Sequence, residues 1–229
     1  MRPSPLPLSP LSQGEGFVFE LLELAPSERD AALEKWLGIA GEVSSLPPGA
    51  ELIGYHASAL APVVAALLET GADQDDVFVD LGCGLGKVTA LARLISGARV
   101  RGIELQQELI SRAPKLEGVE YFHGDVRDAP LDDGTIFYLY NPFCGEVLAQ
   151  VLSRLREVAA KRAITICTLG LSLKEEWLQE RSLEHFWLQV FDSRGHPQRA
   201  RSRHFDPRLV RLANGLSPTR TAAHERPFD

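Results

Sequence analysis

The sequence predicts an α/β fold: a doubly wound, mostly parallel seven-stranded sheet with a C-terminal antiparallel hairpin and an N-terminal helical extension. From residue 76 onward, short apolar runs rich in β-branched residues alternate with segments of helical periodicity. Such alternation is typical of a parallel sheet with helices on both faces. Near the C-terminus two apolar runs instead flank a Ser193-Arg194-Gly195 turn with no helix between them, which predicts the hairpin.

Periodicity places each element of the sheet in turn. The predicted strands cover 77–81, 100–105, 119–122, 135–140, 163–168, 186–191 and 199–205. The predicted helices between them cover 87–95, 106–112, 146–160 and 173–180.

Three helical patterns precede the sheet. Segments 17–24 and 27–39 are amphipathic, and Ser27 is the expected cap of the second helix. A third pattern, with apolar residues recurring from 60 to 68, ends at Gly71 and leads into the first strand. The first two patterns predict an extension that packs against the main domain.

A chain of 229 residues suits one catalytic domain with a small extension. The first segment repeats Pro, Ser and Leu without a period and is expected to be disordered, and the last is expected to be a flexible tail. The expected divisions are a leader at 1–15, the helical extension at 16–54, the catalytic domain at 55–210 and the tail at 211–229.

Composition limits the classes of function. A content of 45% hydrophobic and 24% charged residues is ordinary for a globular protein. No run of eighteen apolar residues and no secretory signal is present, so we expect a cytoplasmic protein without a membrane partner. The three cysteines are too far apart for metal-ligand spacing, which predicts no metal site. A net charge of −7 disfavours an extended nucleic-acid surface.

A glycine-rich loop follows the first predicted strand. Residues 76–87 read D-V-F-V-D-L-G-C-G-L-G-K, with Gly82, Gly84 and Gly86 just ahead of a helix. Glycines permit a tight turn and close approach to a ligand, and the helix start offers free N–H groups. The dinucleotide fingerprint requires Gly or Ala where this chain has Lys87, so a nicotinamide or flavin cofactor is disfavoured.

An acidic residue accompanies this loop. Glu104 ends the second predicted strand, at about the distance where α/β nucleotide sites place a carboxylate against ribose hydroxyls. Asp80 lies near the end of the first strand, two residues before Gly82. Because carboxyl ends of parallel strands meet at one sheet edge, the two acids and the loop predict a single site for a nucleoside-containing cofactor.

The segment 55–167 resembles the class I S-adenosylmethionine-dependent methyltransferases, whose first motif D-x-G-x-G-x-G is matched from Asp80 to Gly86. The resemblance implies that S-adenosylmethionine is the cofactor, that the glycine loop lies under its methionine part and that Glu104 holds its ribose. It also implies that Asp125, in G-D-V-R-D, contacts the adenine amine with Val126 beside the ring. The alternative for each acid is a solvent-facing loop carboxylate.

The fourth strand ends in Asn141-Pro142-Phe143, which resembles the [DN]-P-P-[YF] motif of amino-directed methyltransferases. The resemblance implies that Asn141 and Phe143 are catalytic: the amide accepts hydrogen bonds from the target nitrogen, and the ring stacks against its substituent. One proline is missing, so the aromatic residue lies one position early. The alternative is that Asn141-Pro142 only opens a turn.

Tyr55, in Gly54-Tyr55-His56, precedes the helix that leads into the first strand. It loosely resembles a tyrosine-containing segment of histone-lysine methyltransferases of this fold, which implies a cofactor-covering residue; the alternative is packing. Tyr138 and Tyr140 are either polar contacts or core aromatics. An arginine-rich segment, 194–211, either attracts an acidic substrate or is a solvated surface.

The sequence therefore predicts an S-adenosylmethionine-dependent methyltransferase that acts on a nitrogen of a protein side chain, such as lysine, or of a small molecule. Three alternatives stay open: a catalytically degenerate cofactor-binding scaffold, an NAD-dependent oxidoreductase and a nucleic-acid methyltransferase. The last is disfavoured by the net charge, and nucleic acid is not the expected partner. The pattern leaves the oligomeric state open.

Overall fold

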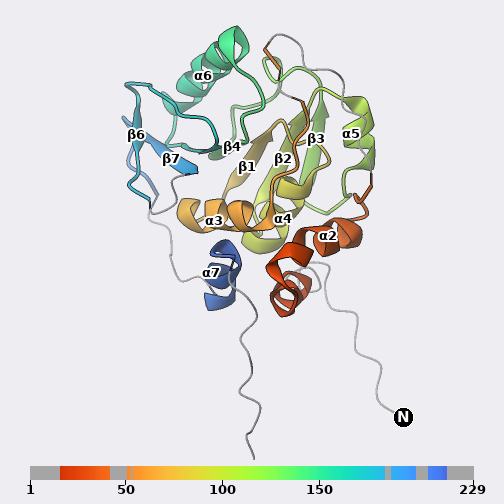
Figure 1. Cartoon of the computed structure of the whole chain (residues 1–229). Coiled ribbons are helices and arrows are strands. Elements are labelled where there is room, and N and C mark those ends of the chain that lie inside the picture. The colour runs from red at the N-terminus through yellow and green to blue at the C-terminus, as the bar shows by residue number, and fades with distance from the viewer. Residues whose placement is uncertain (1–15, 42–50, 53, 184–186, 200–205, 216–229) are drawn as a thin grey trace, which may run out of the picture.

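The computed structural model describes residues 16–41, 51–52, 54–183, 187–199 and 206–215. Its centre is a seven-stranded sheet in the order β3-β2-β1-β4-β5-β7-β6 (Figure 1). The strands are β1 Val77–Leu81, β2 Arg99–Glu104, β3 Val119–His123, β4 Ile136–Leu139, β5 Thr165–Leu169, β6 Leu178–Glu180 and β7 Leu188–Ser193. The helical elements are η1 Leu21–Glu23, α2 Pro26–Leu37, α3 Leu60–Thr70, α4 Lys87–Ser96, α5 Gln107–Arg112, α6 Gly145–Ala159 and α7 Pro207–Ala213.

The strand pairing confirms the predicted fold class. Strands β1 to β5 pair in parallel, and β7 lies antiparallel between β5 and β6. Two apolar clusters cover the two sheet faces, one built with α3 and α4 and the other with α6. On β1, Phe78 belongs to the first cluster while Val77 and Val79 belong to the second, as the two-residue period of a strand requires.

The antiparallel hairpin forms from different residues than the sequence predicts. Residues 178–180 form β6 and pair with β7, so the helix predicted over 173–180 is wrong. Leu173 and Trp177 are four residues apart and both pack in the second apolar cluster, a spacing that imitates a helix, but pairing of residues 178–180 with β7 decides the backbone. The strand predicted over 199–205 falls mostly outside the described residues, and Arg199 itself is not in a strand.

The N-terminal extension packs beneath the sheet domain (Figure 1). Helix α2 begins at Pro26 with Ala25 as its N-cap, so the prediction that Ser27 caps it is wrong. Proline at the first helical position lacks the N–H that would need a cap. Arg29 is buried and donates through Nε to the Leu21 carbonyl at 2.9 Å, which fastens α2 to η1. Helix α7 packs on α3 and spans the expected domain boundary at 210.

No helix among the described residues is long and apolar enough to cross a membrane. Within the same residues, no group of three or more His, Cys, Asp and Glu side chains has a geometry that could hold a metal ion.

Candidate functional site

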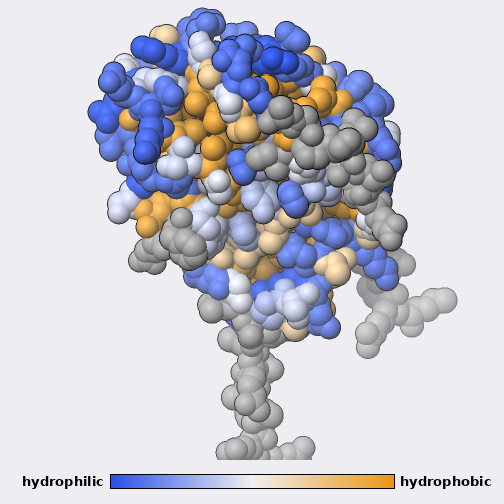
Figure 2. Space-filling model, turned by 45° about the horizontal axis from the view of Figure 1, so that its top comes forward, coloured by the Kyte–Doolittle hydropathy of each residue, from blue (hydrophilic) through white to orange (hydrophobic). Residues whose placement is uncertain are grey.

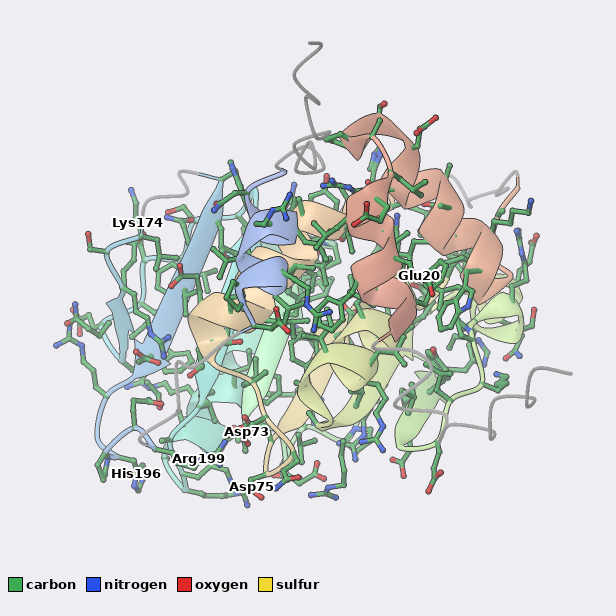
Figure 3. The ribbon with its side chains drawn as sticks, turned by 90° about the horizontal axis from the view of Figure 1, so that it is seen from below. Glu20, Asp73, Asp75, Lys174, His196 and Arg199 are labelled. Atoms are coloured by element: carbon green, nitrogen blue, oxygen red, sulfur yellow. The ribbon has the colours of Figure 1, made fainter. Side chains whose placement is uncertain are left out.

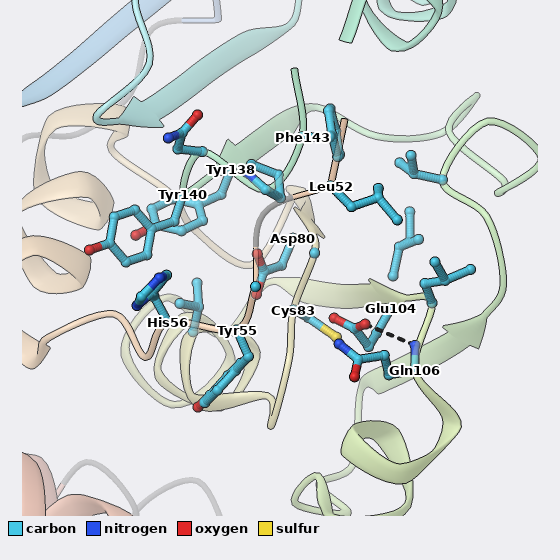
Figure 4. Close-up of a pocket in the computed structure, with 18 of the residues that line it drawn as sticks. Leu52, Tyr55, His56, Asp80, Cys83, Glu104, Gln106, Tyr138, Tyr140 and Phe143 are labelled. Atoms are coloured by element: carbon cyan, nitrogen blue, oxygen red, sulfur yellow. Dashed lines mark hydrogen bonds between the residues drawn. The ribbon is translucent and has the colours of Figure 1, made fainter. Parts of the chain in front are cut away.

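A pocket of about 470 Å³ opens at the carboxyl ends of β1, β2 and β4 (Figure 4). The view that brings this side of the molecule forward shows hydrophobic surface gathered between hydrophilic margins (Figure 2). Most of the site residues predicted from the sequence line this pocket: Tyr55, Asp80, Gly82, Glu104, Asp125, Val126, Asn141 and Phe143. Gly84 and Gly86 are not in its lining.

The glycine loop approaches its neighbours too closely for side chains. A Cβ at Gly82, where φ is +95°, would lie 2.7 Å from the Pro142 Cβ. The loop is held by the Ile103 carbonyl, which accepts hydrogen bonds from the N–H groups of Gly82 and Cys83 at 2.9 Å each. The first glycine therefore brings the loop after β1 against the loop after β4.

Gly84 and Gly86 pack closely against two tyrosine side chains. A Cβ at Gly84 would overlap the ring of Tyr55, and one at Gly86 would lie 2.6 Å from the Tyr121 hydroxyl. Tyr55 packs with Ile39 and Leu85, and in Figure 4 its hydroxyl points away from Asp80. Burial raises the pKa of Tyr55 to about 12, so the hydroxyl is protonated at neutral pH.

Two carboxylates project into the pocket (Figure 4). Glu104 accepts from the Gly84 N–H at 3.0 Å through Oε2 and from the Gln106 N–H at 2.9 Å through Oε1. These bonds fix the carboxylate, and because a carboxylate has about four acceptor sites, others remain for a ligand. The geometry suits a pair of ligand hydroxyls.

Asp80 is the most deeply buried acid of the site, with an exposed fraction of 2%. Its Oδ2 has no hydrogen-bond partner among the described residues. Desolvation, reinforced by the neighbouring Glu104 charge, raises the pKa of Asp80 well above its usual range. An unsatisfied buried acceptor is costly unless a ligand supplies the donor. A cationic, donor-bearing ligand such as one with an ammonium group fits this oxygen.

Lys87 ties the extension to the site, a contact that the sequence did not predict. Its Nζ lies 3.1 Å from Asp30 Oδ1 and 2.6 Å from Glu34 Oε1, both on α2. Asp30 Oδ1 also accepts from the Leu60 N–H, at the start of α3. The available signal was the pair of acids four residues apart, which lie on one face of α2.

The opposite wall of the pocket combines an ion-paired carboxylate with apolar side chains. Asp125 pairs with Arg127, whose Nη2 lies 2.6 Å from Oδ2, and this partner lowers the pKa of Asp125. Val126 is buried beside it. Sequence reasoning missed Leu105, which lines the pocket although 46% of it is exposed. Its position directly after Glu104 was the available signal.

Asn141 lies in a strained backbone conformation. Its φ is +40°, and it is the one non-glycine among the described residues with positive φ. Left-handed backbone costs free energy in any L-residue, although Asn tolerates it better than most, and such outliers cluster at functional sites. The Phe143 ring is buried, and its backbone forms an isolated antiparallel bridge with Leu52.

Tyr138, on β4, and Tyr140, just after its end, differ in burial. Tyr138 is fully buried, and its hydroxyl lies 3.4 Å from the Ser58 Oγ. Tyr140 is 41% exposed and lies at the pocket rim near His56 (Figure 4). His123, at the end of β3, is exposed and outside the lining.

The described arginines beyond residue 194 lie away from the pocket. Arg199 pairs with Asp73, Asp75 and Asp76 at 2.6, 2.9 and 3.0 Å, at the amino edge of the sheet (Figure 3). Arg208 pairs with Asp206 at 2.6 Å. Arg201 and Arg203 of the same predicted basic segment lie outside the described residues.

Residues 79–161 match a family model described as a methyltransferase domain. No curated protein matches the chain. Among solved structures, an RNA methyltransferase from Salinibacter ruber in complex with S-adenosyl-L-homocysteine is 25% identical, with a TM-score of 0.46 over 60% of this chain and 95% of that chain.

Two further structures are similar at lower identity. A TehB-like SAM-dependent methyltransferase from Corynebacterium glutamicum is 15% identical, with a TM-score of 0.42 over 57% of this chain and 86% of that chain. A tRNA (m1A58) methyltransferase from Aquifex aeolicus is 13% identical, with a TM-score of 0.45 over 61% of this chain and 70% of that chain.

Proposed function

The chain is a class I S-adenosylmethionine-dependent methyltransferase, and from that premise we propose that it methylates a nitrogen atom, on a protein side chain such as lysine or on a small molecule. The observation that carries this proposal is the strained Asn141, in the loop that abuts the glycine loop at the Gly82–Pro142 contact. Asn141 lines the pocket, and we expect its amide oxygen to accept from a target N–H beside the cofactor.

The cofactor fits the charges and shapes of the pocket. When bound, S-adenosylmethionine supplies an electrophilic methyl group on a sulfonium. We expect the Glu104 carboxylate to accept from the ribose hydroxyls and the free Oδ2 of Asp80 to accept from the ammonium group. Leu105 and Val126 offer apolar surface for the adenine ring, and Asp125 lies beside them for its amine.

The charge of the lining favours an amine over an anionic acceptor. Two cations line the described pocket, Lys87 and Arg127, and both are already paired with carboxylates. A phosphate or carboxylate acceptor therefore finds no uncompensated cation there, whereas a cationic or neutral amine meets no such obstacle. An amine must lose its proton before transfer, and the Asn141 oxygen orients the remaining N–H.

The acceptor is tested by labelled methyl transfer to poly-L-lysine, free lysine and bulk RNA. We expect label on one of the amines and a large loss of rate in Asn141→Ala. The control Asn214→Ala, which changes the same residue type at the end of α7, should keep the wild-type rate. The RNA arm is included because two of the similar structures are named as RNA and tRNA methyltransferases. Label on RNA alone would replace the proposed acceptor.

A further inference from the structure

Glu51 caps the start of α6 from 96 residues away. The N-cap residue of α6, Cys144, forms no side-chain cap hydrogen bond. Instead, Glu51 Oε2 accepts from the Val147 N–H at 3.2 Å, and the Glu51 carbonyl accepts from the Cys144 N–H at 3.0 Å. A carboxylate at a helix N-terminus satisfies free N–H groups and interacts favourably with the helix dipole.

The same contacts hold the loop that carries Asn141. Leu52, the next residue, forms the backbone bridge to Phe143. Gly145 has a φ of +57°, and a Cβ there would lie 2.7 Å from Glu51 Oε1, so the carboxylate occupies the space of a side chain. Residues 143–147 are thus fixed by the segment at 51–52. A strained φ such as that of Asn141 persists only where the surroundings hold it.

The other side of this segment reaches the glycine loop. Gly54 and Tyr55 line the pocket, and the Tyr55 ring lies against Gly84. Glu51 does not line the pocket itself. Its position lets it act on the Asn141 loop without contacting the cofactor.

We propose that Glu51 is a positioning residue for methyl transfer: it holds the Asn141–Phe143 loop in place through the first turn of α6. The inference rests on the proposed function in placing Asn141 at the acceptor. Removal of Glu51 should lower the rate of methyl transfer without changing cofactor affinity, because it frees the loop after β4 and leaves Asp80 and Glu104 in place.

The test compares Glu51→Ala with Glu146→Ala in the full chain. Glu146 lies in the same first turn, but its carboxylate accepts from the Gln150 side chain at 2.8 Å and not from the loop backbone. Three quantities are measured: affinity for S-adenosylmethionine by titration, amide hydrogen exchange over residues 141–147, and the rate of methyl transfer to poly-L-lysine.

For Glu51→Ala we expect kcat to fall about 10-fold or more, because small misplacements at a reacting centre have effects of this size. Cofactor affinity and binding stoichiometry stay unchanged, and exchange rises at Cys144 and Val147. Glu51→Gln keeps an acceptor oxygen and should therefore retain most of the wild-type rate. Glu146→Ala behaves like the wild type.

Wild-type kcat in Glu51→Ala, or cofactor affinity lost in parallel with kcat, would overturn the inference. If the alanine variant does not fold, Glu51→Asp keeps the charge and withdraws the carboxylate by one methylene, and it is judged by the same outcomes. If wild-type protein methylates neither poly-L-lysine nor free lysine, the proposed acceptor fails separately. The exchange data then test whether Glu51 holds the loop after β4. Unchanged protection of the Cys144 and Val147 amides in Glu51→Ala would contradict the inference.

Discussion

The two halves of the pocket are built in different ways. The cofactor half comes from three consecutive strand ends, between Asp80 and Val126, with two carboxylates at its centre. The acceptor half joins the loop after β4 to the segment around Leu52, which lies far earlier in the chain. One half is a local motif and the other is assembled by tertiary contacts. Changes in the first should alter cofactor affinity, and changes in the second should alter turnover.

Substitution at the junction of the halves has the largest expected effect. Gly82→Val places a side chain where a Cβ already lies 2.7 Å from Pro142, so we expect affinity for S-adenosylmethionine to fall about 100-fold or more. Gly195→Val is the matched control, because Gly195 has a φ of +98°, close to the +95° of Gly82, but nothing within 4 Å of its added Cβ. Titration calorimetry measures both. Equal losses would mean that backbone strain, and not the junction, causes the effect.

The pH dependence of cofactor binding tests whether the Asp80 carboxylate binds the cationic part of the cofactor. Its pKa is raised in the free protein, so below that pKa the side chain is neutral. A cationic ligand favours the carboxylate, and binding therefore releases a proton. Affinity rises with pH up to the raised pKa, by at most about 10-fold per pH unit. Titration in buffers of different ionisation enthalpy measures the released proton. Asp80→Asn should abolish the release, and an unchanged release would assign it to another group.

The smallest expected effect concerns the attachment of the extension. Lys87→Met leaves Asp30 and Glu34 without their shared cation, and we expect the free energy of unfolding to fall by about 1–3 kcal/mol. The lower part of that range is favoured, because the two acids are 38% and 30% exposed and water screens them. Urea denaturation measures the change. Lys161→Met, at an exposed pair with Asp132, should lower the free energy of unfolding by no more than about 0.5 kcal/mol. Equal decreases in the two variants would show that the ion pairs of Lys87 contribute no more than an exposed pair.

The sequence predicted the cofactor half because its signals are local. The glycine motif, Asp80 and Glu104 all follow strands that apolar periodicity identifies, and parallel strands bring their carboxyl ends together. Even there, periodicity did not separate Gly82, which lines the pocket, from Gly84 and Gly86, which pack against tyrosines.

What the sequence did not predict depends on contacts between distant residues. The cap that Glu51 provides for α6 and the ion pairs of Lys87 with α2 join segments more than 50 residues apart. The helix wrongly predicted over 173–180 has the same cause, since β6 is only three residues long and takes its conformation from pairing with β7. Local periodicity carries no information about such partners.

The division of the pocket into two halves is tested most directly by measuring cofactor affinity and methyl-transfer rate side by side in Glu104→Ala and Asn141→Ala. Loss of charge-assisted hydrogen bonds in Glu104→Ala should weaken S-adenosylmethionine binding by about 1–3 kcal/mol, which is roughly 5- to 150-fold. Asn141→Ala should keep the wild-type affinity and lose turnover. Equal losses of affinity in both variants, or full turnover in Asn141→Ala, would contradict the account.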